Sequence, residues 1–544
     1  MDTQRLVLFF VFSFSILMLW EAWQKETRPS QTPVASVPTP GSVPSPGPMP
    51  AGKSAPAVPT ASAEAAESKR EHVRVTTDEL IAEIDTQGGD IVVLELREHK
   101  DINDKNKNFV LLTPQYRYSV QSGLIGANLP NHKTVYTTKT KEAILPESKD
   151  SIELRLVAPA ADGVKVVKVL TFRRGSHLID VSHEVSNGGT APMAAHAYFQ
   201  ITRDGKSPPG DNAMMSTFTG VGLYTEQDKF VKLTFGDLDK GKTPYSKTAD
   251  NGWVGMVQHY FVTALLPAPK EPREYYTRKL SEDFYSAGVI LAMPAIAPGA
   301  TGKVSLPLYA GPQEQEKLKG IAPGLDLVVD YGWLTVIAAP LFWVLEYFHA
   351  WLGNWGLAII MLTVVIKLIF FPLSAASYRS MAKMKVVSPK LMKLREQYGD
   401  DRARMNQAMM ELYKTEKINP LGGCLPIVVQ IPVFIALYWV LLAAVELRHA
   451  PFYGWISDLA APDPWYVLPT LMMGSMIIQT KMNPTPPDPV QAKVMMIMPF
   501  AFGVMFYFFP SGLVLYWFVN NILSILQQWQ ITRMIEAKKP AARR

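Results

Sequence analysis

The stretch LAIIMLTVVIKLIFFP, residues 357–372, carries no charged side chain except Lys367. A run of this length and composition is typical of a helix that crosses a membrane. A cation among lipid tails costs roughly 2.5–3.5 kcal/mol on insertion scales, so such residues usually face a cavity, a partner or a substrate. The alternative is that Lys367 lies near the end of the span, before Pro372, and that its long side chain reaches the headgroups. Position alone leaves both interpretations open.

The composition predicts a membrane part joined to a soluble part. The chain has 544 residues, of which 48% are hydrophobic and only 19% charged, yet its mean hydropathy is +0.05. The net charge of +6 is modest, and basic residues do not alternate with aromatics over a soluble domain, so sequence-specific nucleic-acid binding is not expected. Cys424 is the only cysteine, which excludes an internal disulfide, and no Cys/His cluster has the spacing of a metal site.

The N-terminal region reads as a membrane anchor followed by a tether. The apolar run Leu6–Trp20 follows Arg5 and has no small-residue cleavage site directly after it, which favours an uncleaved transmembrane anchor over 1–27 rather than a signal peptide. Residues 28–70 are rich in Pro, Ala, Ser and Thr. Such a segment cannot bury a core and is expected to form a semi-extended tether.

Residues 71–320 alternate between apolar and polar side chains, as strands do. Val164 and Val166, then Ile179, Val181 and Val185, predict two strands joined through Arg174-Gly175. Many short strands with Gly, Pro and Asn turns predict a large β-sandwich. His177, His183 and His196 are expected on strands, without ligand spacing. Five further strands are predicted at Ile91–Leu96, Ala195–Ile201, Phe230–Phe235, Tyr260–Leu265 and Ala287–Met293.

After residue 320 the chain becomes membrane-like. Residues 321–352 are predicted to form an amphipathic helix in the membrane interface, because Pro340, Glu346 and His349 interrupt the apolar run and three tryptophans suit an interface. Residues 353–535 are predicted to form a core of five transmembrane helices, and 536–544 a basic tail. The five spans are expected at 355–373, 425–445, 465–480, 494–509 and 511–531.

Loop charge predicts the topology. Loop 374–418 has a net charge of +5, tail 532–544 has +4, and the intervening loop 446–464 has −2. The positive-inside rule places the first two in the cytoplasm and the third outside. If 321–352 lies flat on the outer leaflet, the β domain is outside, the N-terminus is inside, and the chain has six spans. If it crosses, the β domain becomes cytoplasmic. The flat arrangement is favoured because segment 346–354 has no Lys or Arg.

The loop 374–418 is predicted to form a cytoplasmic helical hairpin. Ser388-Pro389 resembles a helix start, Tyr398–Arg402 a turn, and Asn419-Pro420 an end. Its methionines suit two roles: packing the two arms together, or accepting varied apolar partners. Its Lys and Arg side chains would meet anionic lipid, ribosomal RNA or a nascent chain.

The sequence lacks the motifs of several enzyme classes. It contains no Walker glycine loop, HExxH or GxSxG, and its five C-terminal spans contain no Asp, Glu or His. We therefore expect no enzyme activity, cofactor or metal. Polar residues within the spans either join helices or, with Lys367, line one wet cavity. They are Thr363, Gln430, Ser475, Gln479, Ser511, Asn520, Asn521 and Gln527.

Ordered motifs between about 325 and 533 resemble the YidC family of membrane-protein insertases, in its Gram-negative form with a large periplasmic domain. They are Val329-Asp330-Tyr331-Gly332-Trp333, Gly353-Asn354-Trp355-Gly356, Pro372-Leu373, Ser380-Met381-Ala382-Lys383-Met384, Asn419-Pro420-Leu421-Gly422-Gly423-Cys424, Gln430, Pro432 and Pro510-Ser511-Gly512-Leu513-Val514-Leu515-Tyr516.

The resemblance implies a fold and a mechanism. The fold is an α-helical polytopic membrane protein with a periplasmic β-supersandwich. The family's basic residue, usually arginine, projects into a hydrophilic groove and draws the polar flank of a client partway into the membrane. Lys367 stands at that position, and Tyr516-Trp517 replaces the family's Tyr-Tyr pair. The competing interpretations are a transporter or channel with a polar pore, and a β-domain receptor whose spans only anchor it. Neither inverted repeats nor paired intramembrane charges support the pore.

The resemblance also implies the site residues and partners. The protein would insert and help fold proteins of the bacterial inner membrane, alone or with the Sec translocon, and would contact nascent membrane proteins, the ribosome and anionic phospholipids. The groove residues would be Lys367, Thr363, Gln430, Ser511, Tyr516, Trp517 and Asn520. The hairpin contacts would be Met381, Lys383, Met384, Lys385, Arg402, Arg404 and Met409.

Overall fold

The computed structural model describes residues 71–537 except 103, 209–216, 399–400, 417–424 and 484–488. The predicted anchor and tether, and all but the first two residues of the predicted tail, lie outside these residues. The described residues divide into two compact units, one that ends at Val329 and one that begins at Asp330. The first unit therefore ends at 329 rather than at 320 as predicted. It includes α3 (Gln315–Ile321) and the 3₁₀ turn η2 (Leu325–Val328), where an interfacial helix was expected to begin.

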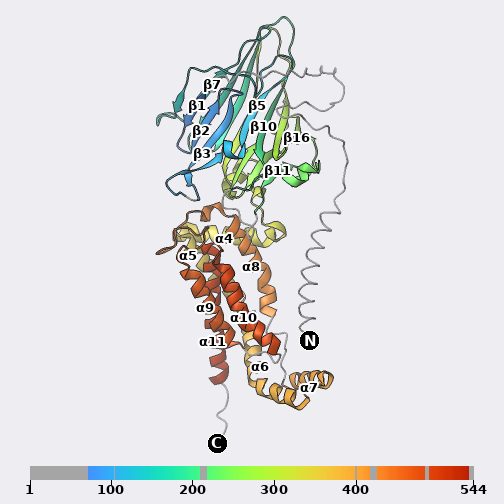
Figure 1. The fold of residues 1–544 in the computed structure, drawn as a ribbon, viewed down its shortest axis with the longest axis vertical. Coiled ribbons are helices and arrows are strands. Elements are labelled where there is room, and N and C mark those ends of the chain that lie inside the picture. Colours follow the sequence, from blue (N-terminus) through green and yellow to red (C-terminus); the bar gives the residue numbers. More distant parts are fainter. Residues whose placement is uncertain are drawn as a thin grey trace. The chain divides into compact units, whose positions relative to one another are not determined.

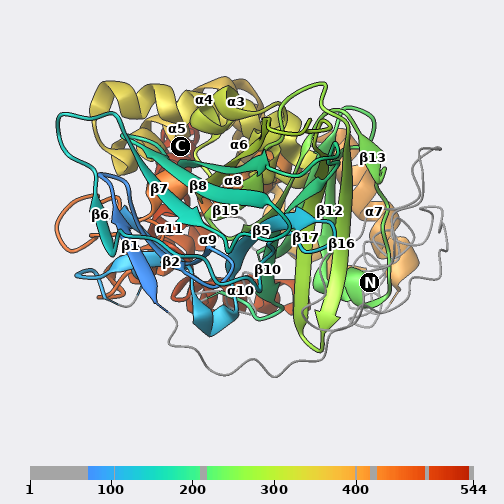
Figure 2. The same cartoon turned by 90° about the horizontal axis from the view of Figure 1, so that it is seen from above.

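The first unit is a β-sandwich of two large sheets (Figure 1; Figure 2 shows it from above). A 10-stranded sheet has the order β13-β16-β17-β10-β5-β3-β2-β1-β6 with β4 beside β3, and an 8-stranded sheet has the order β12-β11-β14-β15-β18-β9-β8-β7. Among these pairings β1 with β6 is parallel and the others are antiparallel. The strand bounds are β1 His72–Thr76, β2 Leu80–Asp85, β3 Asp90–Lys100, β4 Asn108–Leu112, β5 Ser119–Ile125, β6 Glu142–Ile144, β7 Ser151–Val157, β8 Val164–Arg173, β9 Leu178–Asn187, β10 His196–Asp204, β11 Gly220–Thr225, β12 Lys229–Thr234, β13 Thr248–Ala249, β14 Trp253–Gln258, β15 Phe261–Leu265, β16 Arg273–Ser281, β17 Phe284–Ala292 and β18 Thr301–Pro312; the 3₁₀ turn η1 (Pro114–Tyr116) and helix α2 (Phe235–Asp239) connect strands.

The alternation in the sequence located these strands well. The predicted pair through Arg174-Gly175 is the β8–β9 hairpin, and Gly175 adopts a φ of +60° in its turn. The other five predicted runs coincide with β3, β10, β12, β15 and β17. His177 is an exception, because it lies in the connection before β9 and not on a strand.

A buried ion pair joins the two sheets. Lys168 on β8 lies 3.8 Å from the Oδ1 atom of Asp90 at the start of β3, and its Nζ atom donates a hydrogen bond to the carbonyl oxygen of Gly88 at 2.9 Å. Both side chains are almost fully buried. Burial raises the pKa of Asp90 and lowers that of Lys168, because each charged form has lost its water. The pair therefore holds the sandwich together only while both partners are present.

His183 makes the stability of the sandwich depend on pH. Its ring is fully buried on β9, Nε2 bonds Ser122 at 3.1 Å, and Nδ1 has no hydrogen-bond partner among the residues that the structure describes. Burial lowers the pKa of His183 from 6.5 to about 3, so in the window between these values the unfolded chain binds a proton that the folded chain does not. Acid therefore favours unfolding, and this contribution to stability is lost as the pH falls from 6.5 towards 3.

We expect the free energy of unfolding of fragment 71–329 to fall by about 1.4 kcal/mol per pH unit through His183 alone within that window. Urea titrations at several pH values measure this slope. His183→Gln, which places another polar side chain beside Ser122, should reduce the slope by that amount. An unchanged slope in His183→Gln would contradict the assignment.

The second unit is helical, and α11 lies at its centre. In the described residues α11 packs on α5, α6, α8 and α9, while α4 packs on α5 and α8, and α9 packs on α10 (Figure 1). The bounds are η3 Gly332–Leu334, α4 Thr335–Leu352, α5 Trp355–Ile369, α6 Phe371–Tyr398, α7 Arg402–Thr415, α8 Leu425–Ala443, η5 Val445–Leu447, α9 Val467–Met482, α10 Pro489–Phe506 and α11 Ser511–Ala537.

The helix lengths differ from the predicted spans. Among the described residues, the segment Gly332–Leu352 is the one that is long and apolar enough to cross a membrane unaided. Trp355–Ile369 and Phe371–Val387 reach that length together but are bent by 67° at their junction, and Val429–Ala443 and Ala492–Phe506 are apolar but shorter. The predicted straight span over 355–373 is therefore wrong at its end: α5 stops at Ile369. Pro372, which has no N–H to donate, occupies the first turn of the next helix instead.

The hairpin also differs from its predicted form. Pro389 was expected to start a helix, but α6 continues through it from Phe371 to Tyr398. The apolar contacts on both sides of Pro389 explain this, because Val387 and Leu391 form a small core with side chains of α7. Packing of this core outweighs the hydrogen bond that proline removes from the helix.

Candidate functional site: a polar cluster around Lys367

Lys367 is buried inside the helical unit. It lies in the last turn of α5, its side chain is 6% exposed, and its Nζ atom donates a hydrogen bond to Ser524 Oγ of α11 at 2.7 Å. The next two residues, Leu368 and Ile369, point outward and are about two-thirds exposed. The ammonium therefore turns into the bundle, which disfavours the interpretation that it extends to the headgroups.

The cation has no acidic partner. Among the described residues no carboxylate lies within ion-pair distance of Lys367, and Ser524 is its hydrogen-bond acceptor. An ammonium has three N–H donors, so two remain for water or for another chain. Leaving a charge in an apolar bundle without such partners is costly. The site is consequently suited to attract a group with negative or partial negative charge.

Helix α11 gathers polar side chains from the surrounding helices around this cation. Ser524 also bonds the hydroxyl of Tyr378 on α6, and donates its own proton to the carbonyl oxygen of Asn520. Asn520 Oδ1 accepts a hydrogen bond from Gln430 Nε2 of α8 at 2.8 Å, and Gln430 bonds Tyr516. Four helices thus contribute to one connected polar network.

Some polar atoms beside this network remain unsatisfied. Within the described residues, the buried atoms Trp517 Nε1, Gln527 Oε1 and Gln528 Oε1 on α11 have no hydrogen-bond partner. Each such atom costs about 1–3 kcal/mol unless water or another molecule bonds to it. Together they indicate that α11 is adapted to a wet or exchanging environment.

The structure brings together most of the predicted groove residues, but not all. Gln430, Tyr516 and Asn520 join the network of Lys367 as described above. Thr363 lies one turn before Lys367, and its hydroxyl donates a hydrogen bond to the carbonyl oxygen of Ile359 at 2.7 Å. Trp517 packs edge-on against Phe434, with ring centroids 4.5 Å apart. Ser511 is placed elsewhere, at the first residue of α11, where it bonds the carbonyl oxygen of Ala461.

The hairpin residues divide into an inner and an outer group. Met384 and Met409 pack against the core of Val387 and Leu391 between α6 and α7, so these two methionines join the arms. Met392 and Met410 are more than half exposed. Lys383 and Lys385 are exposed, Met381 is half-buried, Arg402 begins α7, and Arg404 pairs with Asp401 at 3.3 Å.

Ser524 and Tyr378 were missed from the sequence. Ser524 follows Asn520 and Asn521 by four and three residues, which places all three on one face of α11. That spacing was a usable signal, since Asn521 also reaches Ser475 of α9 at 3.3 Å. Tyr378 lies beyond the end of the predicted span, and nothing in the sequence linked it to Lys367.

A metal centre is not indicated in the part of the chain that the structure describes. No group of three or more His, Cys, Asp or Glu side chains there is arranged to hold an ion. The cluster around Lys367 consists of one cation with hydroxyl and amide groups. Its chemistry is therefore that of binding and of solvating polar groups.

Sequence comparisons cover the whole chain. The model of the YidC periplasmic domain matches residues 72–344, and that of the 60Kd inner membrane protein matches residues 347–539. The membrane protein insertase YidC of Aromatoleum aromaticum is 57% identical over 100% of both chains, and that of Dechloromonas aromatica is 55% identical over 100% of this chain and 99% of its own. A solved active YidC insertase gives a TM-score of 0.39 at 16% identity, covering 84% of this chain and 92% of that chain.

Fold, site and comparisons first define a class: an inner-membrane protein with a large periplasmic β-sandwich and a helical unit that encloses a polar cluster. The chain belongs to the YidC family of membrane protein insertases. It is an insertase for membrane proteins and not an enzyme. This decides against the transporter or channel that the polar residues alone had left open.

Proposed function

We propose that the insertase acts through a hydrophilic groove whose centre is the cluster around Lys367. The observation that carries this proposal is the buried ammonium of Lys367, bonded to Ser524 and without an acidic partner among the described residues. An incoming client would bring its polar or acidic flank to this cation, which lowers the cost of moving that flank into the membrane. Hydrophobic partitioning of the client's apolar segment into lipid would then complete insertion.

Lysine at this position supports a general electrostatic role. A lysine ammonium is a compact point charge, whereas a guanidinium binds carboxylates in a fixed two-pronged geometry. The hydrogen bond to Ser524 leaves the remaining donors of Lys367 free to turn towards different acceptors. We infer that the site accepts varied polar flanks and does not recognise one sequence.

Short helices support a thinned membrane next to the groove. Helix α9 has 16 residues and α10 has 18, which correspond to about 24 and 27 Å against a hydrocarbon core of about 30 Å. A bilayer adapts to short helices by thinning, at a modest cost per Å. A thinner barrier would assist the passage of hydrophilic flanks.

We further propose six spans with both termini in the cytoplasm, and α4 lying in the outer interface. Trp333, Trp343 and Trp351 are 65–81% exposed and are spread along the whole helix. In a crossing helix Trp343 would fall about 15 Å from Trp333, near the bilayer centre, whereas tryptophan favours the interface. The length and hydropathy of 332–352 would permit a crossing, so the orientation has to be measured.

Cysteine labelling tests this topology. In a Cys424→Ser background, Ser305→Cys in β18, Tyr453→Cys in the loop after α8 and Lys393→Cys in α6 are exposed positions. We expect an impermeant maleimide added to intact spheroplasts to label the first two and not the third. If α4 crosses the membrane, Ser305→Cys and Tyr453→Cys will lie on opposite sides, only one of the two will be labelled, and the six-span topology will be wrong.

The proposed partners are nascent membrane proteins, the Sec translocon and the ribosome. The family's activity implies the first, while the exposed basic residues of the hairpin support contact with ribosomal RNA or anionic lipid. A chaperone role would follow from the same groove, because a helix held there is shielded until its neighbours arrive. The periplasmic sandwich is not required by this mechanism.

Photo-crosslinking of a stalled client tests the groove. A photoreactive residue at Gln430 or Trp517 is expected to crosslink a nascent chain halted with its first apolar segment emerging. The same residue at Ile497, which is 63% exposed on α10 and outside the polar cluster, serves as the control. Equal crosslinking at all three positions would show that the client meets the protein's outer surface and not a groove.

A further inference from the structure

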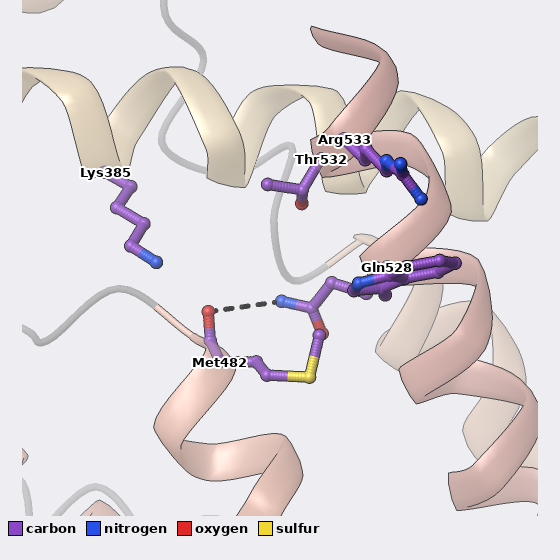
Figure 3. A pocket seen from close by; sticks show the side chains of 6 residues that line it. Lys385, Met482, Gln528, Thr532 and Arg533 are labelled. Atoms are coloured by element: carbon purple, nitrogen blue, oxygen red, sulfur yellow. Dashed lines mark hydrogen bonds between the residues drawn. The ribbon is translucent and has the colours of Figure 1, made fainter. Parts of the chain in front are cut away.

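A hollow of about 180 Å³ lies where α6, α9 and α11 meet, away from the bond between Lys367 and Ser524. Figure 3 shows Lys385 extending from α6 towards Thr532 and Gln528 of α11, with Met482 at the end of α9 on a further side. Trp529 and Arg533 complete the lining. The volume suits a small polar group such as a phosphate.

The hollow is electropositive. Among the described residues neither Lys385 nor Arg533 has an acidic side chain within ion-pair distance. Arg533 lies over the ring of Trp529, 5.4 Å from its centroid, and this contact positions the guanidinium without neutralising it. The amide nitrogen of Gln528 already donates hydrogen bonds to the carbonyl oxygen of Met482 and to Asn483 Oδ1, the latter at 3.1 Å. The unused donors in the lining are therefore those of two cations, the hydroxyl of Thr532 and the indole N–H of Trp529.

An apolar strip of α11 adjoins this charge. Leu526 and Trp529 are each about half exposed and, three residues apart, lie on the same face of α11. A basic end beside an apolar strip matches a molecule with an anionic head and hydrocarbon chains. A soluble anion would leave the strip uncovered.

We propose that the hollow binds the phosphate of an anionic phospholipid, with the acyl chains lying along the α11 strip. The phosphate would lie between Lys385 and Arg533 and would accept a hydrogen bond from the hydroxyl of Thr532. This inference rests on the proposed topology, since that topology places the end of α11 at the cytoplasmic surface. The bound lipid would link the first arm of the hairpin to the last span.

The test uses the full chain in phosphatidylcholine nanodiscs that contain a trace of photoactivatable phosphatidylglycerol, with peptide mapping of the crosslinks. We expect labelling of peptides from α6 and α11 that unlabelled phosphatidylglycerol displaces and phosphatidylcholine does not. The double variant Lys385→Gln/Arg533→Gln should weaken the apparent affinity by roughly 10- to 30-fold, since each basic residue at an anionic surface contributes several-fold.

Lys165→Gln/Lys303→Gln removes the same charge from exposed positions of the β-sandwich and should change the affinity by less than about twofold. Lys385→Arg/Arg533→Lys should retain binding, which separates loss of the site from misfolding. The proposal would be overturned if Lys385→Gln/Arg533→Gln left the labelling unchanged. It would also be overturned if the control double variant reduced the labelling by the same amount. Displacement by millimolar inorganic phosphate or by an acidic client peptide would overturn the choice of lipid. Client insertion is measured in a separate assay, so the result for lipid binding and the result for the proposed groove are independent of each other.

Discussion

Lys367→Glu is expected to abolish insertion of clients whose translocated flanks are acidic. At about 4 Å and an effective dielectric of about 20, two unit charges interact by roughly 4 kcal/mol, and reversing one charge changes attraction into repulsion of that size. The glutamate would also lose the donor that now bonds Ser524. The measurement is complementation of cells depleted of their native insertase, together with protease protection of a client carrying an acidic flank.

Matched variants separate charge from shape. Lys367→Arg should support growth, because it keeps the charge, while Ser524→Ala should give a smaller loss than Lys367→Glu. Lys481→Glu makes the same charge reversal at an exposed position in the last turn of α9 and should complement fully. Full complementation by Lys367→Glu would refute the electrostatic role and leave Lys367 as a residue that only reaches towards the headgroups.

Lys168→Met is expected to destabilise the periplasmic sandwich by about 3–5 kcal/mol, because it leaves the carboxylate of Asp90 buried without its counter-charge. Urea unfolding of fragment 71–329 measures this change. Trp253 is the only tryptophan in that fragment and is fully buried, so its fluorescence reports on the core.

The double variant Lys168→Met/Asp90→Leu should recover much of the loss, since no buried charge remains. Lys165→Met, three residues earlier on an exposed position of β8, should change the stability by less than about 0.5 kcal/mol. Equal unfolding midpoints for Lys168→Met and the wild type would show that the pair contributes nothing. Insertion by the full chain is expected to survive Lys168→Met, because the proposed groove lies in the other unit.

Local patterning predicted the sandwich because burial alternates along several of its strands, such as β1 and β7, while β10, β14, β15 and β17 are buried almost continuously. Val181 and Val185 point into the core between polar neighbours, and this period of two is visible without any knowledge of partners. The buried Lys168 broke the pattern. A lysine between valines looks like a surface residue until Asp90, on the other sheet, provides a counter-charge.

Helix boundaries near proline were less predictable, because tertiary contacts decide them. Pro372 and Pro389 are both compatible with a helix start, yet only the first lies in a first turn. Around Pro389, contacts between α6 and α7 maintain one continuous helix. No local signal distinguishes these two cases.

The sequence predicted the cation of the site, but it did not predict which side chains surround that cation. Lys367 stood out as the only charge in an apolar run. Ser511 was grouped with it as a polar residue of a predicted span and through the family resemblance, but the preceding Pro510 marks the start of α11, where Ser511 bonds a loop carbonyl. Ser524, the actual acceptor, shares a face of α11 with Asn520 and Asn521, but its bond to Lys367 follows only from the packing of α5 on α11.

The junction between α5 and α6 gives the hairpin a mechanical consequence. Helix α6 has 28 residues and is about 42 Å long. Its first residue, Phe371, lies four residues after Lys367. If α6 tilts about Phe371 as a rigid body by about 5°, its end at Tyr398 moves by about 4 Å and Tyr378 by about 1 Å. A displacement at the end of α6 therefore reaches the cluster around Lys367 strongly reduced.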